Sequence, residues 1–238
     1  MIDGVIFDKD GTLFDFRLSW GAWTAKLVRS IAIERTGRPD EVAAAALGAA
    51  IGYDLATGGF DPDSPVIAAT ADDIAAALLP LVPDASQMQL VARLNALAEI
   101  SPMSEAVPLL DVLQALRARG LRLGLATNDS ETPARAHLAA HGVAHLFDFV
   151  AGCDSGHGAK PAPGMLLAFA SQCGLAPARV VMVGDSRHDL FAGRAAGMRT
   201  VGVLTGIAGA AELEPLADAV LPDIGYLGCW IDGFMPAG

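Results

Sequence analysis

The chain has 238 residues and a net charge of −11, from 27 acidic and 16 basic side chains. Such a negative field repels phosphate backbones and anionic lipid headgroups, so we expect neither nucleic acid nor a membrane as a partner. Three widely spaced cysteines argue against a disulfide framework or a zinc cluster. The N-terminus lacks the basic and long apolar segments of a secretory signal, and we therefore expect a cytoplasmic protein.

The first short apolar run, at residues 5–7, predicts a buried strand. After it, helix-like periods follow one another without a convincing strand, at residues 20–35, 40–50, 71–79 and 85–100. Residues 58–65 are rich in glycine and proline and predict a loop within this stretch. We therefore expect an inserted helical cap over residues 16–101, which divides the core into residues 1–15 and 102–238.

From residue 104 onward, predicted strands alternate with predicted helices. The helical periods end at glycines and cover residues 106–119, 132–141, 163–173 and 189–196. The apolar runs between and after them predict strands at residues 121–126, 147–151, 180–183, 200–204 and 218–221. This alternation predicts an α/β fold, with a Rossmann-like parallel sheet covered by helices on both faces.

Polar side chains follow three of the predicted strands directly. They are Asp8, Asp10, Thr127, Asn128, Asp185 and Asp189. Because ligands bind at the carboxyl ends of parallel strands, we expect these side chains to meet on one rim of the sheet. Clustered carboxylates repel one another unless a cation neutralises them, and a donor set made only of oxygen favours Mg²⁺ over zinc.

Two further features indicate phosphorus chemistry. Lys160 is one of three lysines in the chain, and its ammonium group can balance the remaining negative charge and orient a nucleophile. Asp8 and Asp10 are separated by one residue, which allows them different roles. One carboxylate can attack phosphorus while the other donates a proton to the leaving oxygen and later takes one from water.

Taken together, these segments resemble the four signature motifs of the haloacid dehalogenase superfamily. They are Asp8-Lys9-Asp10-Gly11-Thr12-Leu13, Thr127, Lys160 and Gly184-Asp185 through Asp189. The insertion after the first motif is similar to the C1-type cap of that superfamily. Within the superfamily, the sequence most resembles the phosphoglycolate phosphatase group, especially in Val183-Gly184-Asp185-Ser186-Arg187 and Ala192-Gly193-Arg194-Ala195-Ala196-Gly197.

The resemblance implies a role for each motif residue. Asp8 would form an aspartyl-phosphate, and Asp10 would be the general acid and base and offer a backbone carbonyl to magnesium. Thr127 and Lys160 would bind phosphoryl oxygens. The implied metal-site residues are Asp8, Asp10, Asp185 and Asp189, of which Asp189 would either act through water or only orient Lys160. Asn128 and Arg17 are further candidates for substrate binding, Arg17 for a substrate carboxylate.

The implied function is that of a magnesium-dependent phosphohydrolase for a small phosphomonoester, with phosphoglycolate the leading substrate, in a monomer or homodimer. The aspartate at position 10 argues against carbon–halogen cleavage, which the dehalogenase branch performs without it. Phosphonatase chemistry with Lys26, the only lysine of the cap, is a minor alternative. A β-phosphoglucomutase-like sugar phosphomutase and a catalytically idle regulatory protein also stay open.

Several of these residues have a purely structural interpretation as well. Thr127 and Asp189 can each serve as the N-cap of the helix that follows. His137 and His141 lie one helical turn apart, but because no Glu or Cys accompanies them we expect surface residues rather than metal ligands. His188, beside the last motif, can contact substrate or simply be solvated.

The cap offers its own candidates for choosing the substrate. Arg17, Trp20, Lys26 and the loop at residues 60–64 can face the site. Trp20 and Trp23 are predicted to pack within the first helix of the cap.

Overall fold

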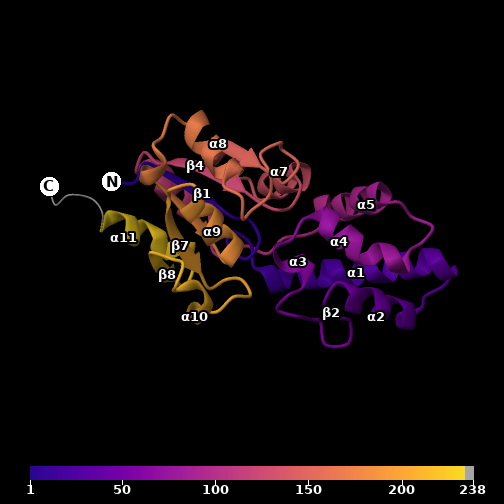
Figure 1. The fold of residues 1–238 in the computed structure, drawn as a ribbon. Helices are drawn as coiled ribbons and strands as arrows, with labels where there is room; N and C mark the ends of the chain where they lie inside the picture. Colours follow the sequence, from indigo (N-terminus) through magenta and orange to yellow (C-terminus); the bar gives the residue numbers. More distant parts are fainter. Residues whose placement is uncertain (234–238) are drawn as a thin grey trace.

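The computed structural model describes residues 1–233, and six of its strands form a parallel sheet (Figure 1). In order across the sheet, the strands are β5 (Phe149–Ala151), β4 (Arg122–Ala126), β1 (Gly4–Phe7), β6 (Val180–Gly184), β7 (Arg199–Val203) and β8 (Ala219–Leu221). All six predicted strands form, with bounds that differ from the expected ones by one or two residues. The prediction of a parallel α/β fold is confirmed.

Helices cover both faces of this sheet because successive side chains of a strand point to opposite sides. The face of Ile6 packs against α8 (Gly164–Gln172) and α9 (Arg187–Ala195). The face of Val5 and Phe7 packs against helices from other parts of the chain. They are α6 (Leu109–Ala118), α7 (Glu131–Ala140) and α11 (Leu227–Asp232).

One close approach explains a glycine in the middle of the sheet. A Cβ at Gly124 of β4 would lie 2.7 Å from the ring of Phe169, so only glycine lets α8 pack on this strand.

Several short elements complete the described chain. They are α10 (Ala210–Leu213) and the 3-10 helices η1 (Leu79–Leu81), η2 (Ala144–Leu146), η3 (Pro177–Arg179) and η4 (Ile224–Tyr226).

Residues 16–101, here called the helical lobe, lie beside the sheet rather than on either face of it (Figure 1). The helices of this lobe are α1 (Phe16–Thr36), α2 (Glu41–Ala50), α3 (Pro65–Ala68), α4 (Ala71–Leu78) and α5 (Gln87–Glu99). The carboxylate of Asp15 accepts a hydrogen bond from the backbone of Leu18 at 2.9 Å and starts α1, and Gly37 ends it with φ of 72°. The exact division of the chain at residues 16 and 102 stays a prediction.

The expectation that this lobe contains no strand is wrong. Two-residue strands, β2 (Tyr53–Asp54) and β3 (Gly59–Phe60), pair antiparallel in a hairpin. Strands this short show no alternating pattern, which is why the sequence did not reveal them. The ring of Phe60 lies 5.3 Å from that of Phe16, so aromatic contact anchors the hairpin on α1. Among the described residues, no helix has the length and apolar character needed to cross a bilayer.

Candidate active site

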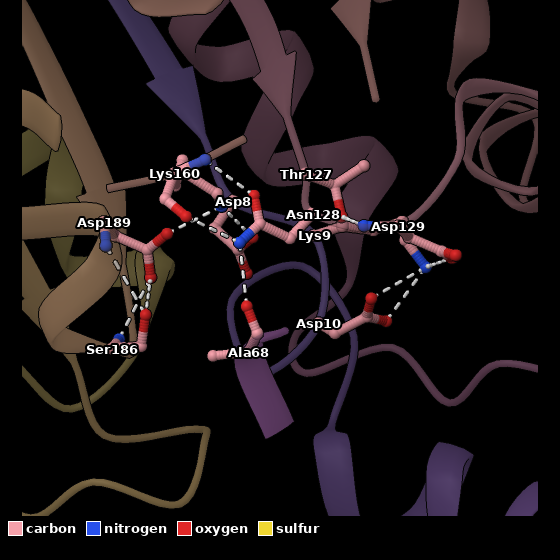
Figure 2. A network of polar contacts seen from close by, with 10 residues as sticks. All are labelled: Asp8, Lys9, Asp10, Ala68, Thr127, Asn128, Asp129, Lys160, Ser186 and Asp189. Carbon is pink, nitrogen blue, oxygen red and sulfur yellow. Dashed lines mark hydrogen bonds and ion pairs between the residues drawn. The ribbon is translucent and has the colours of Figure 1, made fainter. Parts of the chain in front are cut away.

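The carboxyl ends of β4, β1 and β6, which are neighbours in the sheet, bring the predicted polar side chains to one rim (Figure 2). A cavity opens there. Its lining includes Asp8, Asp10, Thr127, Asn128, Lys160, Asp185 and Asp189. Of the predicted site residues, only Arg17 is not brought here, because it lies exposed on α1 and does not line the cavity.

Lys160 connects two of the carboxylates. Its Nζ donates to Oδ1 of Asp8 at 2.5 Å and to Oδ1 of Asp189 at 2.6 Å. The amide of Asn128 fixes the backbone of Lys160 from both sides, because its Oδ1 accepts from the Lys160 N–H at 2.8 Å and its Nδ2 donates to the Lys160 carbonyl at 2.9 Å. Burial opposes the charge of Lys160, but the carboxylates of Asp189 and Asp8 outweigh it and raise the pKa.

The acidic side chains form a compact buried group. Asp8, Asp185 and Asp189 each offer a carboxylate oxygen, and these three atoms lie within 4.8 Å of one another. Burial raises the pKa of Asp8 to about 7, against the effect of Lys160. Burial, and then the charges of Asp8 and Asp189, also raise the pKa of Asp185 well above its usual value. A hard divalent cation would relieve this repulsion, and a carboxylate-only donor set fits magnesium.

Two glycines leave room around the Asp185 carboxylate. A Cβ at Gly11 would lie 2.3 Å from Oδ2 of Asp185, and a Cβ at Gly206 would lie 1.6 Å from the same atom. Gly11 belongs to the first motif, but Gly206 follows β7 far along the chain and carries no motif. Sequence reasoning missed Gly206 because only the folded chain shows what lies against it.

Neither Asp189 nor Thr127 serves as an N-cap, the structural alternative to their roles in the site. The N-cap of α9 is Ser186, and Asp189 occupies the third helical position, so that the two residues form a capping box. The Oδ2 of Asp189 accepts hydrogen bonds from the Ser186 N–H at 3.0 Å and from the Ser186 hydroxyl at 2.6 Å. Ser130 precedes α7, while the Thr127 hydroxyl accepts from the Asp129 N–H at 3.1 Å. Asp189 therefore holds Lys160 with one oxygen and starts α9 with the other.

Lys9, between the two aspartates of the first motif, is completely buried and was not predicted to matter. Its Nζ lies 3.0 and 2.8 Å from the two carboxylate oxygens of Asp10 and 3.1 Å from Oδ2 of Asp129. The same nitrogen lies 3.2 Å from Nδ1 of His137. Burial opposes the charge of Lys9, but Asp10 and Asp129 raise its pKa above the usual value. Lys9 thus fixes the side chain of Asp10.

Comparison with known proteins assigns the chain to a family. The model of the haloacid dehalogenase-like hydrolases matches residues 2–197. The chain belongs to this family. It is similar to the phosphoglycolate phosphatases of Escherichia coli strain K12 and Rhodospirillum rubrum, with 38% identity over 127 and 133 residues. The matches cover 53% and 54% of this chain and 48% and 54% of those proteins, so the chain spans about half the length of the curated relatives it matches.

A solved structure resembles this haloacid dehalogenase-like hydrolase over nearly its whole length. It is described as a predicted phosphoglycolate phosphatase from Haemophilus somnus and has a TM-score of 0.72. The comparison covers 97% of this chain and 98% of the other, at 20% identity. At that identity the likeness concerns the fold alone.

His137 was expected on the surface, but in this haloacid dehalogenase-like hydrolase its side chain is buried and 2% exposed. Its Nε2 lies 2.7 Å from the carbonyl of Ala98, so Nε2 carries the hydrogen and Nδ1 accepts from Lys9. Burial, together with the charge of Lys9, lowers the pKa of His137 to about 4. Its spacing from the buried residues Ala134 and Leu138 on α7 is the signal that could have revealed this position.

The helical lobe supplies the rest of the cavity lining. Trp20 and Trp23 of α1 are buried, with ring centroids 4.7 Å apart as expected of packing residues, and both also line the cavity. Lys26 is exposed and does not line it, and neither do residues 60–64. His188 does line it. The Nδ2 of Asn128 donates to the carbonyl of Ala68 at 2.8 Å and ties the rim to this lobe (Figure 2).

Proposed function

We propose that this chain is a magnesium-dependent phosphohydrolase that acts on a small phosphomonoester through an aspartyl-phosphate on Asp8. The observation that supports this most is the buried pairing of Asp8 with Lys160 at 2.5 Å, beside the carboxylate of Asp185. The family of hydrolases to which the chain belongs supports it further. Because the curated relatives are phosphoglycolate phosphatases, phosphoglycolate is the first substrate to test.

Magnesium, when bound, supplies positive charge that neutralises the carboxylates and the phosphoryl oxygens. The carboxylates of Asp8 and Asp185 would hold it, together with the backbone carbonyl of Asp10. Both oxygens of Asp189 accept hydrogen bonds from Lys160 and Ser186, which favours a role through water or through Lys160.

The chain's own residues divide the chemistry between them. Lys160 favours the ionised form of Asp8, which attacks phosphorus while the bond from phosphorus to the leaving oxygen breaks. Asp10 donates a proton to that oxygen and later takes one from the water that hydrolyses the aspartyl-phosphate. Lys9 holds the Asp10 carboxylate for both steps. Lys160 and the Thr127 hydroxyl bind the phosphoryl oxygens.

Phosphate release in the presence of magnesium tests the proposal. Asp8→Asn is expected to lower kcat at least about 10³-fold, and Asp10→Asn by about 10²- to 10⁴-fold, because one removes the nucleophile and the other the proton donor. Asp84→Asn makes the same chemical change at an exposed position and should leave kcat unchanged. Chelation of magnesium should abolish turnover of the native protein.

Two results would contradict the proposal. Substantial turnover in Asp8→Asn would remove Asp8 as nucleophile. Interconversion of hexose phosphates without net phosphate release would instead identify a sugar phosphomutase, the alternative that the sequence leaves open.

A further inference from the structure

The helical lobe contributes no charged side chain to the lining of the cavity. Its share of the wall consists of small and apolar residues together with two indoles and one amide. Those larger than alanine are Trp20, Trp23, Val66, Ile67, Ile74, Leu94 and Asn95. Every ionisable side chain in the lining comes from the rest of the chain, residues 1–15 and 102–233, here called the sheet lobe. The one lysine in the lining, Lys160, is already paired with Asp8 and Asp189.

Three polar atoms of this wall are buried without a hydrogen-bond partner. They are Nε1 of Trp20, Nε1 of Trp23 and Oδ1 of Asn95. Trp20 and Trp23 are only 7% and 4% exposed. Because buried polar groups in folded proteins are nearly always hydrogen-bonded, three such atoms on residues that line one cavity indicate a ligand that would bind them there.

The chemistry of the wall defines what that ligand can be. Two indole N–H groups require acceptors, and one amide oxygen requires a donor. A hydroxyl is the smallest uncharged group that offers both. The remaining surface is hydrocarbon, which favours an apolar body on the same molecule.

We propose that the substrate is the phosphomonoester of an uncharged, largely apolar alcohol that carries a further hydroxyl, and that Trp20, Trp23 and Asn95 bind that alcohol. This inference rests on the proposed phosphohydrolase function and narrows its substrate class. The phosphoryl group lies among Asp8, Lys160 and the metal-site carboxylates, and the organic group lies against the wall of the helical lobe.

A carboxylated leaving group fits this wall poorly. Burying a carboxylate without a cationic partner is strongly unfavourable. Arg17, the candidate for a substrate carboxylate, and Lys26, which was also expected to be able to face the site, do not line the cavity. His188 is the remaining candidate partner, but it is exposed and belongs to the sheet lobe. Phosphoglycolate, whose leaving group carries a carboxylate, is therefore expected to be a poor substrate despite the names of the curated relatives.

Three esters of one skeleton test the substrate class on the native protein with magnesium. They are benzyl phosphate, 4-(hydroxymethyl)benzyl phosphate and 4-carboxybenzyl phosphate. We expect kcat/KM for the hydroxymethyl ester to exceed that for the carboxy ester at least about tenfold, because the wall desolvates the charge without pairing it. Equal or better turnover of the carboxy ester would overturn the inference.

Conservative variants test the residues. Trp20→Phe and Trp23→Phe keep an aromatic ring but remove the N–H, and Asn95→Leu removes the acceptor. Each should lower kcat/KM for the hydroxymethyl ester about three- to tenfold more than it lowers kcat/KM for benzyl phosphate, the usual effect of one neutral hydrogen bond. Trp230→Phe is the matched control in α11, away from the cavity, and should change neither value. Equal losses for both esters would indicate mere packing and overturn the assignment.

The same assays, with phosphoglycolate added to the three esters, separate the two proposals. If none of the three esters releases phosphate but phosphoglycolate does, the phosphohydrolase function stands and the substrate class fails. If neither the esters nor phosphoglycolate release phosphate, both proposals fail. If benzyl phosphate is hydrolysed and Asp8→Asn abolishes that activity, the function stands, and the comparison of the hydroxymethyl and carboxy esters decides the substrate class alone. The ester comparison uses the native protein, so it decides the matter even where a tryptophan variant does not fold.

Discussion

Replacing Lys9 by methionine should destabilise the protein strongly. Methionine has a similar length, but it removes the one charge that lies within 3.2 Å of Asp10, Asp129 and His137. Removing one partner of a buried ion pair costs about 3–5 kcal/mol, because the other partner stays buried without compensation. The carboxylates of Asp10 and Asp129 are 14% and 12% exposed, so partial solvation should keep the loss near the lower limit, about 3 kcal/mol.

Urea and thermal unfolding measure this loss. About 3 kcal/mol corresponds to a decrease in Tm of roughly 6–12 °C for a chain of this size. Adding Asp129→Asn to Lys9→Met should restore part of the stability, since it removes one of the stranded charges. Lys26→Met, at an exposed lysine of α1, is the matched control and should change the free energy of unfolding by at most about 0.5 kcal/mol. A Lys9→Met protein within about 1 kcal/mol of the native one, or a double variant no more stable than the single, would refute the reasoning.

Two further predictions concern His137 and Gly206. The pKa of His137 falls from 6.5 to about 4 on folding, so its contribution to the free energy of unfolding is fully present above pH 6.5, and about 3 kcal/mol of it is lost as the pH falls to 4. His137→Gln should therefore flatten the dependence of the free energy of unfolding on pH between 6.5 and 4. An unchanged slope would count against burial of a neutral ring. Gly206→Ala should weaken magnesium binding about 10- to 100-fold by displacing Asp185, whereas Gly209→Ala, with open space around its Cβ, should not. Magnesium titration of the two alanine variants measures this, and equal affinities would contradict it.

The sheet and its polar rim were predictable because their causes are local. Short apolar runs at residues 5–7 and 180–183 identified β1 and β6. Asp8 follows the first run directly, and Asp185 follows the second after Gly184. The rule that parallel strands share one ligand-binding edge then predicted that these carboxylates would meet.

The rest of the site depends on contacts between distant parts of the chain. Lys9 carries a charge that the sequence alone assigns to the surface, and only the approach of Asp129 and His137 makes its burial tolerable. Arg17 follows the first motif closely, yet it lies off the buried stripe of α1 that begins with Phe16 and Trp20. Nearness in sequence therefore did not predict which side chains of the helical lobe reach the cavity.

The position of β1 between β4 and β6 has a consequence for how the protein acquires activity. Gly4 pairs with Arg122 on one side and with Val180 on the other, so both neighbours of the first strand are synthesised more than a hundred residues after it. Such non-local pairing is slow and leaves unpaired strand edges in the meantime. A nascent chain that has not yet produced β6 holds Asp8 without Asp185, so we expect the proposed site to be incomplete until the last third of the polypeptide has folded back onto its beginning.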